Sequence, residues 1–359
     1  MNNIARIQEA LVRQDLDAIL ITDEKNQRYA TGFAFTDGAV VVSREKAWLL
    51  TDSRYIEAAE KVAGGCCAVQ MFDRQHSLTE LIRAALAESG SERLAAEDEQ
   101  LSHARWAGME KALGLQLLPA GGLMMGLRAS KSQEEIESMI AAQRISEKAL
   151  EEVLHIIKPG MTEKEVMAEL VYYMLKFGSE GNSFDPIVVT GANTSMPHGV
   201  PGDTVIRDGD FITMDFGSLK NGYCSDMTRT VAVGHATEEM KKVYYTVLEA
   251  QLAGIAAARA GIPGKLIDKA ARDVIEKAGY GPYFGHGFGH SLGLDIHEAP
   301  NAGPRGEALM AENDLCSAEP GIYLPGKFGV RIEDVMILRK DGAEVITKAP
   351  KMELIVLNN

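Results

Sequence analysis

One turn signal constrains the fold of this chain more than any other feature. Asn221 and Gly222 separate two runs rich in apolar and β-branched residues, 211–220 and 223–233. Because both residues tolerate a positive φ, Asn-Gly is the favoured centre of a two-residue type I′ hairpin turn. The pair therefore predicts that the two runs are antiparallel strands, and it fixes their register.

That register brings two aspartates together. Asp215 is expected opposite Thr228 and Gly217 opposite Asp226, so the two carboxylates lie diagonally on one face of the hairpin, with Cα atoms about 7 Å apart. Like charges on an apolar strand repel each other and are costly to bury unless a cation lies between them. A solvated hairpin with two exposed acids explains the pair equally well, and a one-residue bulge would undo it. The hairpin raises the hypothesis of a metal site.

A second informative stretch holds three histidines within twelve positions: His286, His290 and His297. Glycines between them let backbone and ligands approach closely, and imidazoles suit metal coordination and proton transfer near neutral pH. Surface placement explains any one of them but explains all three poorly. The glycines lack the G-x-G-x-x-G spacing of a dinucleotide site. Glu319, before a Pro-Gly turn, and Glu333 are further candidates, although each alone is more typical of a surface acid.

Composition narrows the class of protein. Lys and Arg number 37 and Asp and Glu 51, a formal charge of −14 that disfavours nucleic acid and anionic membranes as partners. No apolar run approaches the ~18 residues that span a bilayer, and the N-terminus lacks the pattern of a signal peptide, so we expect no membrane contact and a cytoplasmic location. The four cysteines form no C-x-x-C pair, which predicts free thiols.

A length of 359 residues predicts about two domains. The periodicity breaks at 119–122 and a capping box follows at Ser132 and Glu135, so we expect an α/β domain over 1–127 and an α+β domain over 128–359. Helix caps are expected at Ser77, Ser132, Thr162 and Thr237, and strands at 18–22, 38–42, 46–50, 186–190, 211–218, 223–233 and 330–338.

These residues resemble a known family. Five of them, in chain order, match the ligands of the dinuclear site of the M24 "pita-bread" metallopeptidases: Asp215, Asp226, His290, Glu319 and Glu333. That family holds methionine aminopeptidases, aminopeptidase P and prolidase. The run 286–298 is similar to the proline-peptidase signature at almost every position, 196–201 resembles its loop with a catalytic histidine, and 51–56 looks like part of a creatinase-type N-terminal domain. The implied fold is a creatinase-like N-terminal α/β domain followed by a pita-bread catalytic domain.

The resemblance implies two divalent metal ions. Asp215 would bind one, Asp226 and Glu333 would bridge both, and His290 and Glu319 would bind the other. Four carboxylates and one imidazole form an oxygen-rich site that favours Mn²⁺, with Co²⁺ or Zn²⁺ also able to occupy it. Glu319 would in addition take a proton from the attacking water and deliver it to the leaving nitrogen.

Further roles also come from the resemblance. His198 and His297 would contact the substrate around the scissile bond, and His286 would support the substrate pocket. Arg331 would orient Glu333 or bind the substrate carboxylate, while a structural ion pair is an equally good account of it.

The expected activity is hydrolysis of a small peptide with proline after the scissile bond, by an Xaa-Pro dipeptidase (prolidase). Aminopeptidase P, which acts on longer peptides, is the alternative. Two more distant possibilities are a non-catalytic binding module on the same fold and a metal-free hydrolase resembling creatinase. The family also leads us to expect a homodimer.

Overall fold

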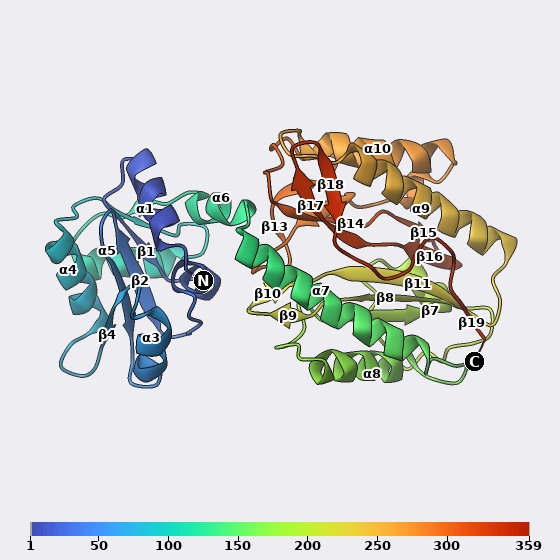
Figure 1. The fold of residues 1–359 in the computed structure, drawn as a ribbon, viewed down its shortest axis with the longest axis horizontal. Helices are drawn as coiled ribbons and strands as arrows, with labels where there is room; N and C mark the ends of the chain where they lie inside the picture. The colour runs from blue at the N-terminus through green and yellow to red at the C-terminus, as the bar shows by residue number, and fades with distance from the viewer. Residues whose placement is uncertain (1, 359) are drawn as a thin grey trace. The chain divides into compact units, whose positions relative to one another are not determined.

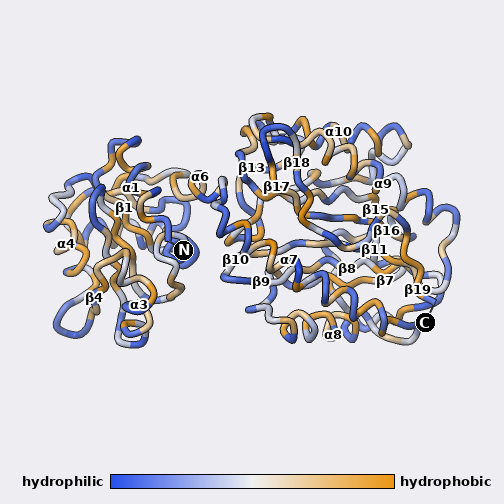
Figure 2. Tube along the Cα trace, in the orientation of Figure 1, coloured by the Kyte–Doolittle hydropathy of each residue, from blue (hydrophilic) through white to orange (hydrophobic). Residues whose placement is uncertain are grey.

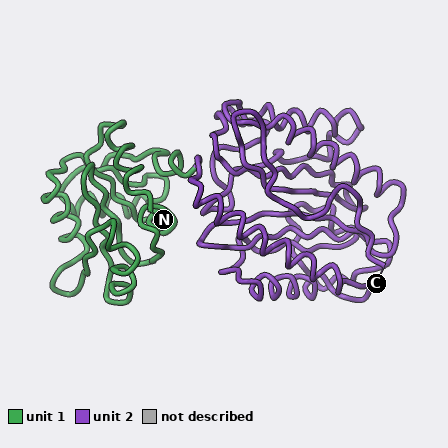
Figure 3. Tube along the Cα trace, viewed as in Figure 1, with its two compact units in different colours: residues 1–128 green, residues 129–359 purple. Residues whose placement is uncertain are grey.

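The computed structural model describes residues 2–358. The chain divides into two compact units, Met1–Arg128 and Ala129–Asn359 (Figure 3). Each unit has a hydrophobic core of its own, and the residues singled out from the sequence all belong to the second.

Unit 1 is an α/β domain built on one sheet. Its elements are α1 (Ile4–Arg13), β1 (Ala18–Ile21), α2 (Glu24–Thr31), β2 (Gly38–Ser43), β3 (Ala47–Thr51), α3 (Ile56–Ala63), β4 (Ala68–Met71), α4 (Leu78–Ser89), β5 (Leu94–Ala96), α5 (His103–Leu113), β6 (Leu118–Pro119) and α6 (Leu123–Ala129), the last reaching the division between the units. The strand order is β4-β3-β2-β1-β5-β6. β1, β2 and β3 pair antiparallel and the outer strands pair parallel, so the sheet is mixed.

Unit 2 is an α+β domain with two larger sheets. Its elements are α7 (Gln133–Leu154), α8 (Glu163–Lys176), β7 (Ile187–Thr190), η1 (Gly191–Ser195), β8 (Phe211–Phe216), β9 (Leu219–Lys220), β10 (Tyr223–Cys224), β11 (Met227–Val233), α9 (Glu238–Ala257), α10 (Gly264–Lys277), η2 (Gly281–Tyr283), β12 (Gly289–Ser291), β13 (Glu298–Ala302), β14 (Leu315–Ala318), β15 (Gly321–Leu324), β16 (Phe328–Arg331), β17 (Asp334–Arg339), β18 (Gly342–Val345) and β19 (Val356–Leu357).

A pair of helices packs on each of the two larger sheets of unit 2 (Figure 1). α7 and α8 cover the sheet β19-β11-β8-β7, where Leu170 and Met214 share one buried cluster. α9 and α10 pack with the sheet β13-β12-β14-β17-β18, where Val247 and Met336 share another. Hydrophobic and hydrophilic residues alternate along α8, as expected of a helix with one buried face (Figure 2).

The predicted helix caps are confirmed. Ser77, Ser132 and Thr162 each close a capping box, with the glutamate three residues later bonded back to the cap, and the Thr237 side chain accepts from the Met240 amide. Such local signals survive because the bonded groups lie within one turn of the chain.

The predicted hairpin is also confirmed. Asn221 and Gly222 have φ of 51° and 76°, as a type I′ turn requires. Lys220 pairs with Tyr223, and Thr228 pairs with Asp215 in the same register. The described pairs contain no bulge between these points, so the two aspartates keep the predicted offset.

The single strand expected over 330–338 is wrong. The chain forms β16 and β17 in two different sheets, because the ladder is interrupted at Ile332 and Glu333, where the Glu333 amide donates to the Thr228 carbonyl instead. Before this break Arg331 pairs with Gly321 of β15, and after it Asp334 pairs with Ala318 of β14. The apolar alternation of Val330 and Ile332 is interrupted here by two consecutive charged residues, Glu333 and Asp334, which is a local sign of the break.

The other expectations about class can be compared directly. Cys66, Cys67, Cys224 and Cys316 are free thiols, as predicted. No helix within the described residues has the length and apolarity that a membrane crossing requires.

Candidate metal centre and active-site cleft

Unit 2 contains a cleft of about 580 Å³. Every side chain singled out from the sequence lies along its wall: His198, Asp215, Asp226, His286, His290, His297, Glu319, Arg331 and Glu333. The residues come from segments up to 135 positions apart, so the fold rather than local sequence brings them together.

The five acidic and imidazole candidates lie within strands or directly beside them. Asp215 is on β8, Asp226 immediately precedes β11, and His290 is the middle residue of β12. Glu319 lies between β14 and β15, and Glu333 lies between β16 and β17. Side chains at such breaks leave the regular alternation of a strand and can turn into a cleft.

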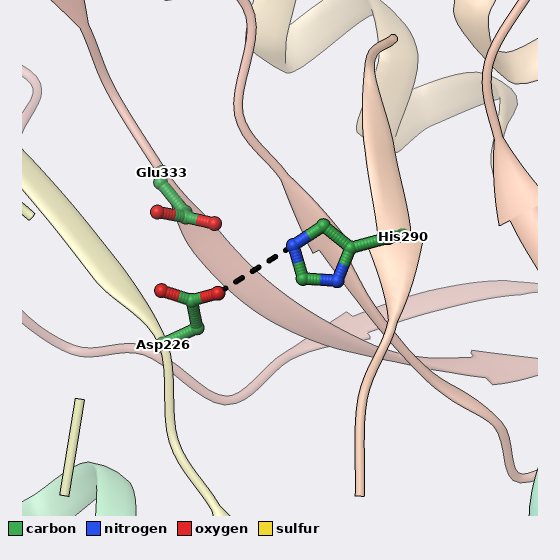
Figure 4. A group of neighbouring side chains, drawn as sticks. All are labelled: Asp226, His290 and Glu333. Atoms are coloured by element: carbon green, nitrogen blue, oxygen red, sulfur yellow. Dashed lines mark ion pairs between the residues drawn. The ribbon is translucent and has the colours of Figure 1, made fainter. Parts of the chain in front are cut away.

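Three of these side chains form a tight group. One ligand atom from each of Asp226, His290 and Glu333 lies within 4.8 Å of the others (Figure 4). The Nε2 atom of His290 is 3.6 Å from Asp226 Oδ2 and 3.3 Å from Glu319 Oε1. One imidazole nitrogen therefore faces two carboxylates.

The backbone sets the tautomer of His290. Its Nδ1 atom lies 3.2 Å from the Ser291 carbonyl oxygen, which can only accept a hydrogen bond. Nδ1 therefore carries the proton, and Nε2 presents its lone pair to the cleft. Burial lowers the pKa of His290, which further favours the neutral ring. A neutral imidazole of fixed orientation is the form that binds a metal.

Arg331 connects Asp215 to His286. Arg331 Nη2 is 2.5 Å from Asp215 Oδ2, and its Nη1 donates to the Tyr323 hydroxyl at 2.9 Å. The same hydroxyl lies 2.9 Å from His286 Nε2, while His286 Nδ1 lies 2.8 Å from the Gly287 carbonyl. Arg331 is thus ion-paired with Asp215, which agrees with the structural ion pair that the sequence analysis gave as one of three accounts of this residue.

Thr228 connects Glu333 to Arg331 through two hydrogen bonds of its hydroxyl group. The Thr228 hydroxyl donates to Glu333 Oε2 at 2.7 Å and accepts from Arg331 Nε at 3.0 Å. Thr228 stands opposite Asp215 in the hairpin register, so one cross-strand neighbour links two of the candidate ligands.

The electrostatics of the cleft call for positive charge. Burial raises the pKa of Asp226 well above its ordinary value, and repulsion from Glu333 and Asp215 raises it further. Burial, followed by repulsion from Glu319 and Asp215, does the same to the pKa of Glu333. Among the described residues, Asp215 Oδ1 and Asp226 Oδ1 are buried without a hydrogen-bond partner. Unsatisfied oxygens on mutually repelling carboxylates, beside an imidazole lone pair, fit a divalent cation.

The remaining predicted residues also face the cleft. The His297 ring lies 4.3 Å from the His290 ring, centroid to centroid. Burial and then the nearby His290 lower the pKa of His297, so it is neutral near pH 7. His198 lies in the loop after η1, and burial lowers the pKa of His286.

Sequence reasoning missed two residues that line the cleft, Asp185 and Arg305, and two that bond to its wall, Thr228 and Tyr323. Thr228 could have been found, because the predicted register placed it opposite Asp215. Tyr323, Asp185 and Arg305 carry no comparable signal, since each is an isolated polar residue in an ordinary loop or strand. Arg305 is exposed and makes no ion pair with any described residue.

Comparison with known proteins decides the family. The profile of metallopeptidase family M24 matches residues 137–340, and that of the Creatinase/Prolidase N-terminal domain matches residues 3–130. The chain belongs to metallopeptidase family M24. Its mixed fold, a creatinase-type N-terminal domain followed by an M24 catalytic domain, is as the resemblance implied.

Individual M24 relatives match over nearly their whole length. An uncharacterized peptidase, YqhT, of Bacillus subtilis is 39% identical over 95% of this chain and 96% of its own. The structure of an Xaa-Pro dipeptidase from Bacillus anthracis has a TM-score of 0.93 at 41% identity, covering 99% of each chain. That of an X-Pro aminopeptidase from Thermotoga maritima has a TM-score of 0.91 at 35% identity, covering 99% of this chain and 100% of its own.

Proposed function

We propose that this M24 metallopeptidase hydrolyses Xaa-Pro dipeptides with two divalent cations bound in the cleft of unit 2. The convergence of four carboxylates and one imidazole on one cleft supports this proposal more than any other observation. The names of relatives, among them Xaa-Pro dipeptidases, point to the same substrate class. Neither observation favours a non-catalytic module.

We propose the ligand assignment that the resemblance implied. Asp226 and Glu333 would be shared by both cations, Asp215 would complete one site, and His290 and Glu319 would complete the other. The 3.3 Å approach of His290 Nε2 to Glu319 supports the last pairing. Because oxygen donors dominate, Mn²⁺ is the proposed metal, with Co²⁺ and Zn²⁺ as competitors.

Glu319 is the proposed proton carrier. When bound, the cations would polarise the scissile carbonyl and favour ionisation of the attacking water. Burial raises the pKa of Glu319, which brings this carboxylate closer to the range where it can both accept and return a proton. The proline nitrogen of an Xaa-Pro bond carries no hydrogen, so it needs a proton as the C–N bond breaks, and Glu319 would deliver the one it took from water.

His198 and His297 are proposed to contact the substrate. Both line the cleft, and the neutral His297 ring lies against the His290 ring at an interplanar angle of 65°. In their neutral form such rings can donate a hydrogen bond to the carbonyl oxygen as it gains negative charge. His286 and Arg331 are proposed to support the site without contacting the scissile bond, because they bond to Tyr323 and Asp215.

Arg305 supports the preference for dipeptides. It is an exposed cation at the cleft wall with no acidic partner among the described residues. A dipeptide presents its free carboxylate one residue beyond the scissile bond, and a guanidinium binds such a group through two parallel hydrogen bonds. We therefore assign the substrate carboxylate to Arg305 instead of Arg331.

Aminopeptidase P activity is the second candidate, because solved relatives include the X-Pro aminopeptidase of Thermotoga maritima at 35% identity. Purified, Mn²⁺-loaded protein should be assayed on Ala-Pro, Ala-Pro-Ala and Ala-Ala. We expect cleavage of Ala-Pro, little cleavage of Ala-Pro-Ala and none of Ala-Ala. Cleavage of the tripeptide alone would reject the dipeptidase, and a raised KM for Ala-Pro in Arg305→Ala would support the carboxylate assignment.

Three broader expectations remain part of the proposal. Residues 1–127 and 128–359 are taken as the N-terminal and catalytic domains. The protein is proposed to act in the cytoplasm as a homodimer. Light scattering of the purified protein tests the subunit number, since a monomeric mass would reject the dimer.

A further inference from the structure

One fully buried glutamine, Gln251, lies on α9 outside the cleft wall. Its neighbours on the helix, Val247, Ala250 and Gly254, are buried and small or apolar. Burying an amide costs free energy unless its hydrogen bonds are made. The hydrogen-bond partners of Gln251 therefore indicate the role of its side chain.

Those partners adjoin two proposed ligands. Gln251 Nε2 donates to the Ala318 carbonyl at 2.9 Å and to the Ile332 carbonyl at 3.2 Å. Ala318 directly precedes Glu319, and Ile332 directly precedes Glu333. A single nitrogen thus holds the two backbone segments that carry these glutamates.

The strand register explains why the glutamine is needed here. Ala318 pairs with Asp334 on one side of the break and Gly321 with Arg331 on the other, in one continuous register. That register places Glu319 opposite Glu333 and Pro320 opposite Ile332.

Pro320 leaves this position without a donor. Leu338 N bonds to Asp314 O in the same register, and such pairs recur at every second residue of an antiparallel ladder. In this pattern Pro320 and Ile332 form a hydrogen-bonded pair, in which the residue at 320 would donate its N–H to the Ile332 carbonyl. Proline has no N–H, so this hydrogen bond cannot form. Gln251 supplies the missing donor to the Ile332 carbonyl.

We propose that Gln251 is a positioning residue that fixes the spacing of Glu319 and Glu333 across this break and thereby sets the affinity of the cleft for its second divalent cation. The inference rests on the proposed function, because it takes both glutamates as cation ligands. Groups around metal ligands commonly change metal affinity by about 10–100-fold when removed.

The far side of Glu333 is held by other groups. Arg229 Nη1 donates to the Glu333 carbonyl at 2.5 Å and Nη2 pairs with Asp334 at 2.7 Å. Lys351 contacts Asp334 and donates to Gln251 Oε1 at 2.6 Å. Gln251 thus adds a side-chain link between this braced segment and the Glu319 segment, at the point where their backbone ladder is interrupted.

The test is to titrate the metal-free full chain with Mn²⁺ alone and to measure the heat of binding by calorimetry. We expect wild type to bind two ions and Gln251→Met to bind the weaker of the two about tenfold less tightly or worse. In the peptide assay this variant should lose kcat at limiting Mn²⁺, keep its KM, and regain rate with excess Mn²⁺. A role in folding alone would not be rescued in this way.

Gln143→Met is the matched control. Gln143 is also a fully buried helical glutamine, but its side-chain atoms have no hydrogen-bond partner among the described residues. It should bind Mn²⁺ like wild type. If Gln251→Met does not fold, Gln251→Glu decides, because it keeps the acceptor for Lys351 and loses both amide donors.

Two results separate the failures. Wild-type Mn²⁺ affinity in a folded Gln251→Met or Gln251→Glu variant, with only a lower unfolding temperature, would overturn the positioning role while leaving the proposed function intact. A wild-type protein that binds two ions but does not cleave Ala-Pro would reject the proposed function and leave the positioning role standing.

Discussion

Asp226 has unfavourable surroundings when no cation is bound. It is buried, one of its oxygens has no described hydrogen-bond partner, and Glu333 and Asp215 repel it. Such a residue stabilises the fold only when a cation offsets its charge. Selection for metal binding explains its presence better than selection for stability.

Replacement of Asp226 should therefore have opposite effects on activity and on metal-free stability. We expect Asp226→Ala to lose bound Mn²⁺ and to reduce turnover by about a thousandfold or more, because it removes a shared ligand. In EDTA the variant should unfold at the same or a higher temperature than wild type, since the repulsion is relieved. Near-normal turnover with two bound ions would contradict the role.

His198 tests the substrate side of the cleft. His198→Ala should reduce kcat by about 10²-fold or more while keeping the full metal content, because its proposed contact is with the substrate and not with a cation. Metal analysis of the purified variant provides the check. Loss of bound metal would contradict the proposed contact of His198 with the substrate.

At the scale of elements, the β8–β11 hairpin sets the offset between Asp215 and Asp226. Gly217 lies between β8 and the turn, where the chain crosses close to the opposite strand. A Cβ atom there would lie 1.9 Å from the Ser225 carbonyl oxygen. The backbone could accept it only by moving Ser225, which adjoins Asp226.

Gly217→Ala should consequently weaken both folding and metal binding. We expect a lower free energy of unfolding, by about 1–3 kcal/mol, and reduced Mn²⁺ affinity. Gly181→Ala is the control, since its Cβ would meet only a leucine methyl at an ordinary 3.7 Å. Equal behaviour of the two variants in denaturant titration and calorimetry would refute the packing argument.

A buried charge cluster joins four separate segments of the same unit. Lys131 Nζ lies 2.9 Å from Asp314 Oδ1 and 3.3 Å from Glu298 Oε2, and Asp314 also bonds to the Ser291 hydroxyl. One ammonium faces two carboxylates, so one negative charge is in excess. Burial raises the pKa of Asp314 to about 6 despite the opposing effect of Lys131.

This shift predicts a pH dependence of stability. The folded protein holds the Asp314 proton more tightly than the unfolded chain, whose pKa is 3.8, so stability falls as pH rises from 3.8 through about 6. Denaturant unfolding in EDTA at about pH 5 and about pH 7.5 should show a loss in wild type that is smaller in Asp314→Asn. Identical losses in both proteins would exclude Asp314 as the source.

At the scale of the whole molecule, the bound cations should be an energetic part of the native state. Ions that bind only the folded chain stabilise it by mass action. EDTA followed by dialysis should abolish Ala-Pro hydrolysis and lower the unfolding temperature, and Mn²⁺ should restore both. Unchanged turnover after chelation would favour the metal-free hydrolase related to creatinase.

Features that depend on neighbours along the chain could be predicted from the amino-acid sequence. The Asn221-Gly222 turn fixed a register that held from Lys220 to Asp215, because backbone conformation at two residues sets the pairing of a hairpin. Capping boxes likewise predicted where helices begin. The histidine cluster, together with the resemblance, predicted the family and the cleft residues.

The contacts between distant segments could be seen only in the three-dimensional structure. It paired Arg331 with Asp215 across 116 positions, broke the expected 330–338 strand at Glu333, and placed Gln251 of a separate helix at that break. A proline that withholds a ladder donor and a helix that supplies one become partners only when packing brings them within hydrogen-bond distance, and no local pattern encodes that.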